Sequence, residues 1–360
     1  MKKKVLLGMS GGVDSSVAAL LLLEQGYDVI GVTMKLRPDN LPQGPTGSCG
    51  SLDDTQDARQ VADWLGIPHL VWDFSDRFCQ KVVDYFVAEY LCGRTPNPCV
   101  ACNRYLKFDA MLERALEEGC DYIATGHYAR IEKSPDGRWL LKRAPNQKDQ
   151  SYVLYHLTQF QLAHTLFPLG GLDKSQARAL AQQRGLPVAF KPDSQEICFI
   201  PDKDYAGFIT RYTKNASQPG NFVDQAGRVL GQHRGIIHYT IGQRKGLGCS
   251  FGKPMYVVRI CPQNNTVVLG EEGSQYASSL TAQRLNWIPF STLEQPLQVT
   301  AKVRYQATAA AATIYPLSND QVQVEFEQPQ RSVTPGQAVV FYNGDTVIGG
   351  GTIVSPGASA

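Results

Sequence analysis

The stretch Gly8-Met9-Ser10-Gly11-Gly12-Val13-Asp14-Ser15 follows a short apolar run, Val5–Gly8, and leads into an Ala- and Leu-rich segment, Ser15–Gln25. A strand, a glycine-rich turn and a helix in this order aim the free N–H groups and the positive dipole end of the helix at the turn. The two glycines permit a tight turn and a close approach to a ligand. The stretch therefore predicts a loop that binds phosphate or pyrophosphate.

The loop differs from two common nucleotide-binding sequences. It lacks the Gly-Lys-Ser/Thr ending of a Walker loop, and it does not have the GxGxxG spacing of dinucleotide-binding proteins. A tight strand–helix turn with Asp14 as the helix cap is the purely structural interpretation. A carboxylate at this position also suits Mg²⁺, which is held by one or two carboxylates together with substrate phosphates.

The first two hundred residues alternate β-branched runs with helix-like segments. The expected strands are Val5–Gly8, Val29–Met34, Pro68–Phe74 and Tyr122–Thr125, and the expected helices are Ser15–Gln25, Asp53–Leu65, Tyr105–Glu118 and Lys174–Arg184. Such alternation predicts βαβ units and a mostly parallel, Rossmann-like sheet in an α/β domain.

The character of the chain changes near residue 205, where helical periodicity disappears and turn dipeptides recur. Tyr256–Ile260 and Thr266–Leu269 predict a hairpin, and Asn343-Gly344 predicts another turn. The last eighty residues predict a small all-β barrel or sandwich. We therefore expect three domains, at residues 1–204, 205–280 and 281–360.

Composition excludes several classes of protein. The chain has 360 residues, of which 43% are hydrophobic and 19% charged, so it can bury a core. Its net charge of +2 excludes binding of nucleic acid by bulk positive charge, although residues 201–280 hold nine Lys and Arg against five Asp and Glu. No apolar stretch reaches the ~18 residues of a membrane span, and the basic start Met1–Lys4 is followed by a broken apolar run. We expect a cytoplasmic protein with no membrane partner.

The nine cysteines do not form a secreted disulfide framework, because their number is odd and the chain is long. Cys99-Val-Ala-Cys102 follows a loop stiffened by two prolines, and a helix is expected from Asn103. Thiols near a helix N-terminus have low pKa values and are often reactive. Cys198 stands before an apolar stretch. The remaining thiols are interpreted as buried and structural: Cys49, Cys79, Cys92, Cys120, Cys249 and Cys261.

The glycine loop resembles the signature of PP-loop ATP pyrophosphatases, which cleave ATP between the α and β phosphates and activate a carbonyl oxygen as an adenylate. Further strings are similar to the tRNA-specific 2-thiouridylase family: Gly93–Pro98, Cys102-Asn103, Ala124–Arg130, Asp149–Ser151, Lys191–Ile200 and Tyr239–Gly248. The resemblance implies a PP-loop domain, a small central tRNA-binding domain and a C-terminal β-barrel. It also implies formation of 2-thiouridine at the wobble uridine, U34, in the anticodon stem-loop of tRNA.

The same resemblance implies roles for individual residues. Gly8–Ser15, Met34 and Gly126 would bind ATP, with Mg²⁺. Cys198 would receive a persulfide sulfur from a donor protein, either a cysteine desulfurase or a relay protein, and Cys102 would release it by closing a disulfide with Cys198. Contacts with tRNA are implied for Asn97, Pro98 and Cys99, which would face the target base, and for His127, Lys148, Asp149, Gln150, Arg304, Tyr305 and Gln337. An alternative interpretation without a role in tRNA binding is that His127 is a ring packed at the end of a strand and that Lys148 is a solvated loop charge.

Position 99 departs from the family pattern, because a familiar form of the family has Asp where this chain has Cys99. Three thiolates, from Cys99, Cys102 and Cys198, can hold a [4Fe-4S] cluster with one open iron, or zinc. A cluster that carries sulfur is therefore the alternative to the persulfide. Two further hypotheses remain open at this point. They are a PP-loop ATP-dependent ligase of a small molecule and a non-catalytic metal or redox module.

Overall fold

The structure, a computed structural model, describes residues 2–37, 52–192, 197–215, 217–318 and 320–357. Cys49 and residues 193–196 of the string Lys191–Ile200 therefore lie outside the described residues. The chain divides into two compact units. The first comprises Met1–Val82, Cys99–Lys203 and Asp345–Val347, and the second comprises Val83–Pro98, Asp204–Gly344 and Ile348–Ala360. No helix within the described ranges combines the length and the apolar character needed to cross a bilayer.

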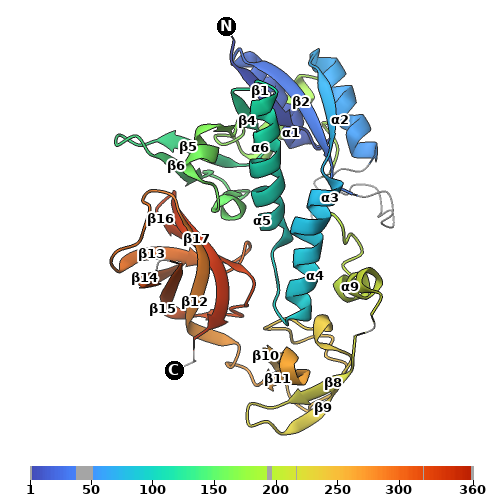
Figure 1. Cartoon of the computed structure of the whole chain (residues 1–360), viewed down its shortest axis with the longest axis vertical. Coiled ribbons are helices and arrows are strands. Elements are labelled where there is room, and N and C mark those ends of the chain that lie inside the picture. Colours follow the sequence, from blue (N-terminus) through green and yellow to red (C-terminus); the bar gives the residue numbers. More distant parts are fainter. Residues whose placement is uncertain (1, 38–51, 193–196, 216, 319, 358–360) are drawn as a thin grey trace. The chain divides into compact units, whose positions relative to one another are not determined.

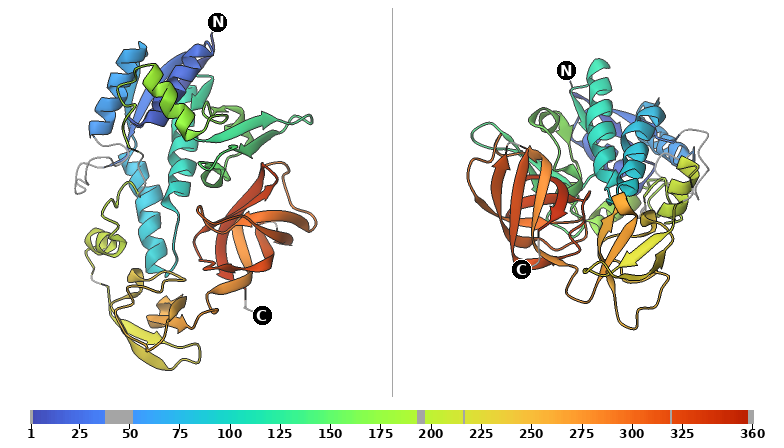
Figure 2. Two further views of the ribbon diagram at one scale, coloured as in Figure 1. Left: turned by 180° about the vertical axis from the view of Figure 1, so that it is seen from behind. Right: turned by 60° about the horizontal axis from the view of Figure 1, so that its bottom comes forward.

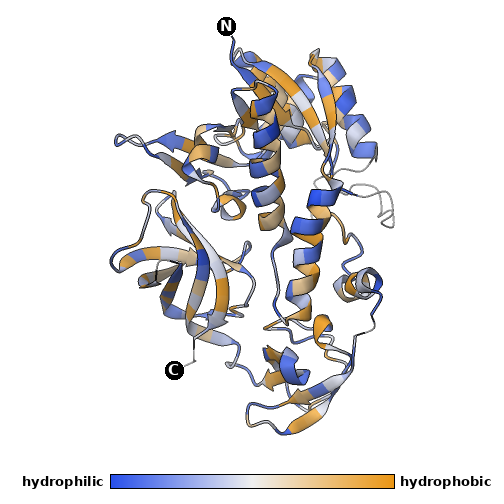
Figure 3. Cartoon of the chain, viewed as in Figure 1, coloured by the Kyte–Doolittle hydropathy of each residue, from blue (hydrophilic) through white to orange (hydrophobic). Residues whose placement is uncertain are grey.

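Five parallel strands form the central sheet of the first unit (Figure 1). Their order across the sheet is β3 (His69–Asp73), β2 (Asp28–Lys35), β1 (Lys4–Gly8), β4 (Tyr122–Ala124) and β7 (Thr165–Leu166). The apolar run predicted the central strand correctly: Val5, Leu6 and Leu7 are all buried, as in a strand covered on both faces. Figure 3 shows β1 and β2 as largely hydrophobic. Since β2 and β4 flank β1 on opposite sides, the carboxyl end of β1 is a switch point, where such sheets bind ligands.

Helices α1 (Val13–Glu24) and α2 (Leu52–Leu65) share one apolar core with the sheet, and α1 shares a second with α8 (Lys174–Gln183). Helix α8 begins with a capping box in which Asp173 and Gln176 each satisfy the other's backbone N–H. Helix α1 instead has Gly12 at its N-cap, with no side-chain cap bond, and Asp14 lies in its first turn. The purely structural interpretation, in which Asp14 caps this helix, is therefore not what the structure shows.

Several elements were not predicted. They are α3 (Ser75–Phe78), η1 (Cys79–Val83), α4 (Asp84–Leu91), the hairpin of β5 (Ala129–Lys133) and β6 (Trp139–Arg143), η3 (Ser151–Leu154) and α7 (Gln159–Ala163). The predicted helix Tyr105–Glu118 begins earlier, because α5 (Pro98–Cys102), the π-helix η2 (Asn103–Ala110) and α6 (Met111–Glu117) follow one another without a break. The helix thus starts at Pro98, a residue type favoured in the first turn, rather than at Asn103.

The second unit holds a four-stranded sheet and a barrel (Figure 2). The sheet has the order β10 (Tyr256–Cys261), β11 (Thr266–Gly270), β8 (Gly220–Val223) and β9 (Val229–His233), and the short helices η4 (Ile236–His238) and η5 (Pro262–Asn264) adjoin its strands. The predicted hairpin is confirmed by the antiparallel pairing of β10 with β11. Helix α9 (Tyr205–Thr213) contradicts the expectation that helices end near residue 205; its N-cap is Asp204, whose carboxylate accepts from the N–H of Gly207.

The barrel consists of β12 (Tyr276–Trp287), β15 (Gln321–Arg331), β14 (Ala310–Ser318), β13 (Leu297–Lys302), β16 (Ala338–Asn343) and β17 (Thr346–Pro356). Adjacent strands are hydrogen-bonded in that order, and pairing of β12 with β17 closes the ring. Alternating residues such as Val322, Val324 and Phe326 point into a common core. The α/β class with a C-terminal all-β barrel is thereby confirmed. The first residues of β17 belong to the first unit, where Thr346 pairs with Lys142.

A buried histidine makes the stability of the first unit depend on pH. His156 is 4% exposed and lies beside Phe108 and Tyr155. Burial, reinforced by the positive charge of Arg104, lowers the pKa of His156 to about 3. The folded state therefore holds this imidazole neutral, whereas the unfolded chain protonates it near its usual pKa.

Above the pKa of the unfolded chain, His156 is neutral in both states and its titration does not lower the free energy of unfolding. As the pH falls from there toward the folded pKa, we expect the free energy of unfolding to decrease, because only the unfolded chain takes up the proton. His156→Phe, which keeps a ring in the core, lacks this decrease. Between pH 7.5 and 4.5 the free energy of unfolding of the native chain should fall by roughly 2–3 kcal/mol more than that of the variant. Urea denaturation across this pH range measures the difference, and parallel pH profiles would contradict the assignment.

Candidate functional site

The loop Gly8–Ser15 lies between β1 and α1 at the carboxyl edge of the parallel sheet, as the sequence predicted. The hydroxyl of Ser15 accepts from the N–H of Ser10 at 3.2 Å and donates to the carbonyl of Gly12 at 3.1 Å. The Ser10 and Ser15 hydroxyls are 3.4 Å apart. The loop is thus held by its own serines, while no side chain caps the first turn of α1. Uncapped first-turn N–H groups and the helix dipole favour an anion at this position.

Two glycines are required for the backbone to pack this closely. Gly11 has φ +67, and a Cβ there would lie 2.3 Å from the carbonyl oxygen of Asp54. A Cβ on Gly126, which follows β4, would lie 2.8 Å from the backbone nitrogen of Ser15 and 2.9 Å from the carbonyl carbon of Asp14. Gly126 therefore lies directly against the glycine loop, although it is 111 residues away from Ser15 in the chain.

Asp14 is the polar centre of this site. Its Oδ1 accepts a hydrogen bond from the hydroxyl of Tyr128 at 2.7 Å and an ion-paired one from Nζ of Lys174, also at 2.7 Å. The Lys174 side chain is 15% exposed, so this ion pair is largely shielded from water. A Walker loop carries a lysine in its own sequence, whereas here the first residue of α8 supplies a cation to the loop.

The other predicted nucleotide contacts lie on the same sheet. Met9 is buried, and its N–H donates to the carbonyl of Val32 on β2. Met34 is half-buried near the carboxyl end of β2, next to Trp72 on β3 in the strand register. The fold thus brings Gly8–Ser15, Met34 and Gly126 to the same edge of the sheet.

Lys191, which precedes Cys198 in the chain, is held by an ion-pair cluster. Nζ of Lys191 donates to Asp54 at 2.7 Å and to Asp57 at 2.5 Å on α2. These two carboxylates raise the pKa of Lys191 against the opposing effect of its burial. Beyond Cys198, Phe199 and Ile200 are buried, and the Phe199 ring meets Phe78 edge to face at 5.6 Å. Cys198 thus directly precedes a pair of buried anchoring residues.

The three predicted site cysteines differ in exposure. Cys99 is exposed in the first turn of α5, whereas Cys102, at the end of α5, and Cys198 are half-buried; all three are thiols in this structure. The expectation that the remaining cysteines are buried is wrong for Cys92 and Cys249, which are exposed, and for the half-buried Cys79 and Cys261. Only Cys120, among the described ones, is buried, and burial raises the pKa of its thiol.

The donor groups of the site bear on whether it holds a metal ion or a cluster. Across the described ranges, which include Cys99, Cys102 and Cys198, no three Cys, His, Asp or Glu side chains converge as a metal site. The arrangement of these three thiols therefore does not fit a [4Fe-4S] cluster or zinc. The carboxylate of Asp14 does fit Mg²⁺, an ion that takes most of its ligands from water and substrate phosphates.

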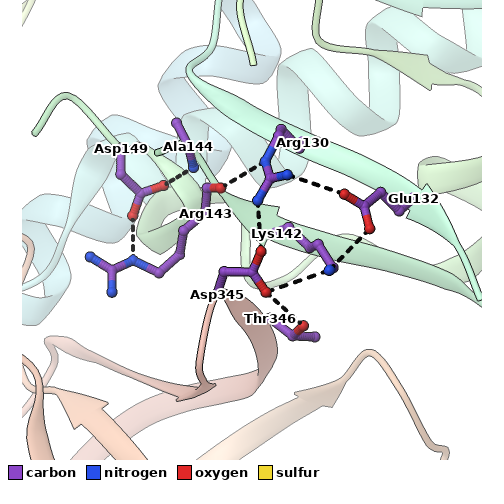
Figure 4. A network of polar contacts seen from close by, with 8 residues as sticks. All are labelled: Arg130, Glu132, Lys142, Arg143, Ala144, Asp149, Asp345 and Thr346. Atoms are coloured by element: carbon purple, nitrogen blue, oxygen red, sulfur yellow. Dashed lines mark hydrogen bonds and ion pairs between the residues drawn. The ribbon is translucent and has the colours of Figure 1, made fainter. Parts of the chain in front are cut away.

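The predicted tRNA contacts in the first unit fall into two groups. His127 is 8% exposed, its Nδ1 lies 2.7 Å from the Thr125 hydroxyl, and burial together with the positive charge of Lys107 lowers its pKa well below the usual value. Lys148 is exposed and Gln150 half-buried. Asp149 is buried between them, and Figure 4 shows its carboxylate contacting Arg143 and the N–H of Ala144.

The remaining predicted contacts lie in the second unit or at its edge. Nε2 of Gln337 donates to the carbonyl oxygens of Thr95 and Pro96 at 3.0 and 3.3 Å, which joins the barrel residue to the segment before Asn97 and Pro98. Asn97 is half-buried and Pro98 buried. Arg304 and Tyr305 are exposed in the turn after β13.

Sequence reasoning missed Tyr128 and Lys174 as partners of Asp14. Tyr128 lay within the string Ala124–Arg130, and Lys174 was recognised only as the start of a helix. Neither position carries a local signal, because their relation to Asp14 spans 114 and 160 residues of chain.

The close approach of Gly126 to α1 generates a prediction. In Gly126→Ala the added Cβ must displace the backbone of Asp14 and Ser15, since both contacts are with backbone atoms. We expect affinity for an ATP analogue to fall at least about tenfold, or ~1.4 kcal/mol. Gly171→Ala is the matched control, because nothing lies within 4 Å of its Cβ position. Equal affinities of the two variants, measured by calorimetry, would contradict the role of Gly126.

Comparison with known families agrees with this geometry. Residues 3–202 match the tRNA methyl transferase HUP domain, residues 206–271 the tRNA methyl transferase PRC-barrel domain, and residues 277–353 the aminomethyltransferase beta-barrel domain.

Relatives are similar over almost the whole chain. The tRNA-specific 2-thiouridylase MnmA of Acetivibrio thermocellus is 58% identical over 98% of this chain and 99% of its own length. Proteins of the same name from Clostridioides difficile and Clostridium acetobutylicum are 53% and 55% identical, each over 98% of this chain and over 98% and 100% of their own lengths. With its glycine loop at the switch point of a parallel sheet and this full-length similarity, the chain belongs to the tRNA-specific 2-thiouridylase (MnmA) family.

Proposed function

We propose that this chain is a tRNA-uridine 2-sulfurtransferase, which uses ATP to convert the wobble uridine U34 of tRNA to 2-thiouridine. The observation that carries the proposal is the pairing of an ATP-type loop, centred on Asp14, with two half-buried thiols, Cys102 and Cys198, in one compact unit. The name shared by relatives over their full length supports the substrate. Neither the small-molecule ligase nor the non-catalytic metal module accounts for that similarity.

The first step makes a poor leaving group expellable. The O2 atom of uridine attacks the α-phosphorus of ATP, the bond to the bridging oxygen breaks, and pyrophosphate leaves. The first turn of α1 and Nζ of Lys174 stabilise the charge that develops on pyrophosphate. Mg²⁺ bound at Asp14 would neutralise part of the same charge when present.

The second step replaces the activated oxygen by sulfur. The terminal sulfur of a Cys198 persulfide attacks C2 and AMP leaves with O2. Cys102 then attacks the Sγ of Cys198, which closes a disulfide and leaves the sulfur on C2. In the alternative order Cys102 attacks first and releases hydrosulfide, which then attacks C2. Either order oxidises the two thiols to a disulfide, so a thiol reductant is needed between turnovers.

We assign tRNA recognition to all three proposed domains, at residues 1–204, 205–280 and 281–360. Asn97, Pro98 and Cys99 face the target base, which must leave its stack to reach the loop. Contacts with the anticodon stem-loop are assigned to His127, Lys148, Asp149, Gln150, Arg304, Tyr305 and Gln337. Residues 201–280, with their net charge of +4, add phosphate contacts that position the RNA. The enzyme works in the cytoplasm and takes its sulfur from a persulfide-carrying protein.

The two-step route predicts separable effects of thiol loss. We expect Cys102→Ser and Cys198→Ser to lower 2-thiouridine formation to below about 1% of the native rate, because neither hydroxyl can carry or release sulfur. Pyrophosphate release in the presence of unmodified tRNA should persist in both variants, because adenylation precedes sulfur transfer. Cys92→Ser, at an exposed thiol, is the control. RNA-independent pyrophosphate release with undiminished thiolation in Cys198→Ser would refute the proposal.

The persulfide route and the cluster route differ in their need for Cys99. We expect Cys99→Asp, which introduces the residue of the family's familiar form, to retain thiolation, because a carboxylate can still manage protons beside the target base. Protein purified without oxygen should contain far less than one iron per chain. Stoichiometric iron and acid-labile sulfide in the native protein, with loss of both and of thiolation in Cys99→Asp, would establish the cluster instead.

A further inference from the structure

Asp14 is linked through Tyr128 to Gln150, which is distant from it in the sequence. Its Oδ1 accepts a hydrogen bond from the Tyr128 hydroxyl, and both the N–H and the carbonyl of Tyr128 are hydrogen-bonded to Gln150. The N–H of Tyr128 donates to Oε1 of Gln150 at 3.0 Å, and the N–H of Gln150 donates to the carbonyl of Tyr128 at 2.9 Å. Any displacement of Gln150 therefore acts on the residue that orients Asp14.

Tyr128 has little freedom to absorb such a displacement. It is 2% exposed and packs in an apolar cluster with Val13 and Val17 of α1 and Ala177 of α8. Interiors of this kind are close-packed, so a shift of the ring is passed to the first turn of α1 and the start of α8. These are the two elements that carry Asp14 and Lys174.

The loop that contains Gln150 is also internally rigid. The Asp149 carboxylate accepts from the N–H of Ala144 at 3.1 Å, from the N–H and hydroxyl of Ser151 at 3.1 and 2.9 Å, and from Nε of Arg143 at 3.3 Å. Nδ2 of Asn146 donates to the carbonyl of Leu172 at 2.7 Å, two residues before Lys174. The loop is thus also anchored to the segment that leads into α8, while its contact with Asp14 runs through the Tyr128 hydroxyl.

We propose that Tyr128 is a positioning residue that couples occupancy of the Lys148–Gln150 loop by tRNA to the placement of Asp14 at the nucleotide loop. The inference rests on the proposed function, because it takes tRNA as the ligand of that loop. Its consequence is that bound tRNA strengthens nucleotide binding, so that ATP is held in its reactive position when the uridine acceptor is present. By linkage, nucleotide must strengthen tRNA binding by the same factor.

The test uses the full-length protein, an unmodified tRNA transcript with U34, and α,β-methylene-ATP, which cannot be cleaved between the α and β phosphorus atoms. Calorimetry gives the dissociation constant of the analogue with and without saturating tRNA. For the native protein we expect tRNA to tighten the analogue by at least roughly fivefold, the lower end of usual coupling. In Tyr128→Phe, which keeps the buried ring but lacks the hydroxyl, the ratio should fall to about one, while the analogue and tRNA each still bind alone.

A matched control distinguishes coupling from general stability. The hydroxyl of Tyr212 on α9 donates to Oδ1 of Asp84 at 2.7 Å, the same type and length of bond as in the Tyr128–Asp14 pair. Tyr212→Phe should retain the native coupling. As a measurement that needs no variant, hydrogen exchange in the first turn of α1 should slow when tRNA binds the native protein without nucleotide.

The outcomes separate this inference from the proposed function. Native-like coupling in Tyr128→Phe, absence of coupling in a native protein that binds both ligands, or unchanged exchange in α1 would overturn the role of Tyr128 and leave thiolation standing. Failure of the native protein to bind tRNA would contradict the proposed function itself. Coupling that is lost in Tyr128→Phe and retained in Tyr212→Phe would establish the link.

Discussion

The carboxylate of Asp14 is the point on which the nucleotide site depends. It lies in the first turn of α1, where it would compete with an anion for the uncapped N–H groups if it were not held elsewhere. The Tyr128 hydroxyl and the Lys174 ammonium hold it through one oxygen. Three segments distant in sequence, at residues 14, 128 and 174, are thereby fixed around one strand end. The rest of the loop follows from this constraint, since the backbone of Asp14 and Ser15 leaves room only for a glycine at position 126.

The same arrangement suits the proposed stabilisation of a leaving pyrophosphate by a loop that has no lysine of its own. A cation contributed by α8 is placed by a helix N-terminus that a capping box holds rigidly. Because Asp14 pairs with this lysine, the site does not hold an isolated, largely buried charge. The thiols lie on different supports: Cys102 ends the first helical turn of α5, and Cys198 directly precedes the buried Phe199 and Ile200.

Asp149 illustrates how a motif residue and a contact residue differ. The string Asp149–Ser151 was recognisable in the sequence, yet its carboxylate is buried and accepts four hydrogen bonds from its own loop. Its role in this structure is to shape the loop. The exposed Lys148 and the half-buried Gln150 lie on either side of it in the chain. The ion pairs of Arg130 and Lys142 with Asp345, shown in Figure 4, tie the β5–β6 hairpin to the residue that directly precedes β17 and belongs to the first unit.

The sequence by itself determined the central parallel sheet, the glycine loop, the all-β character of the last eighty residues and the family, because each depends on local periodicity or on strings of adjacent residues. Val5–Leu7 reads as a buried strand, and Gly8–Ser15 as a phosphate loop, without knowledge of any partner. It failed where short elements have weak periodicity, as in the β5–β6 hairpin and α9, and where a helix continues through irregular turns, as from Pro98. The tertiary structure alone decided the partners of Asp14 and the exposure of the described thiols, since contacts across more than a hundred residues arise from packing and leave no local trace in the chain.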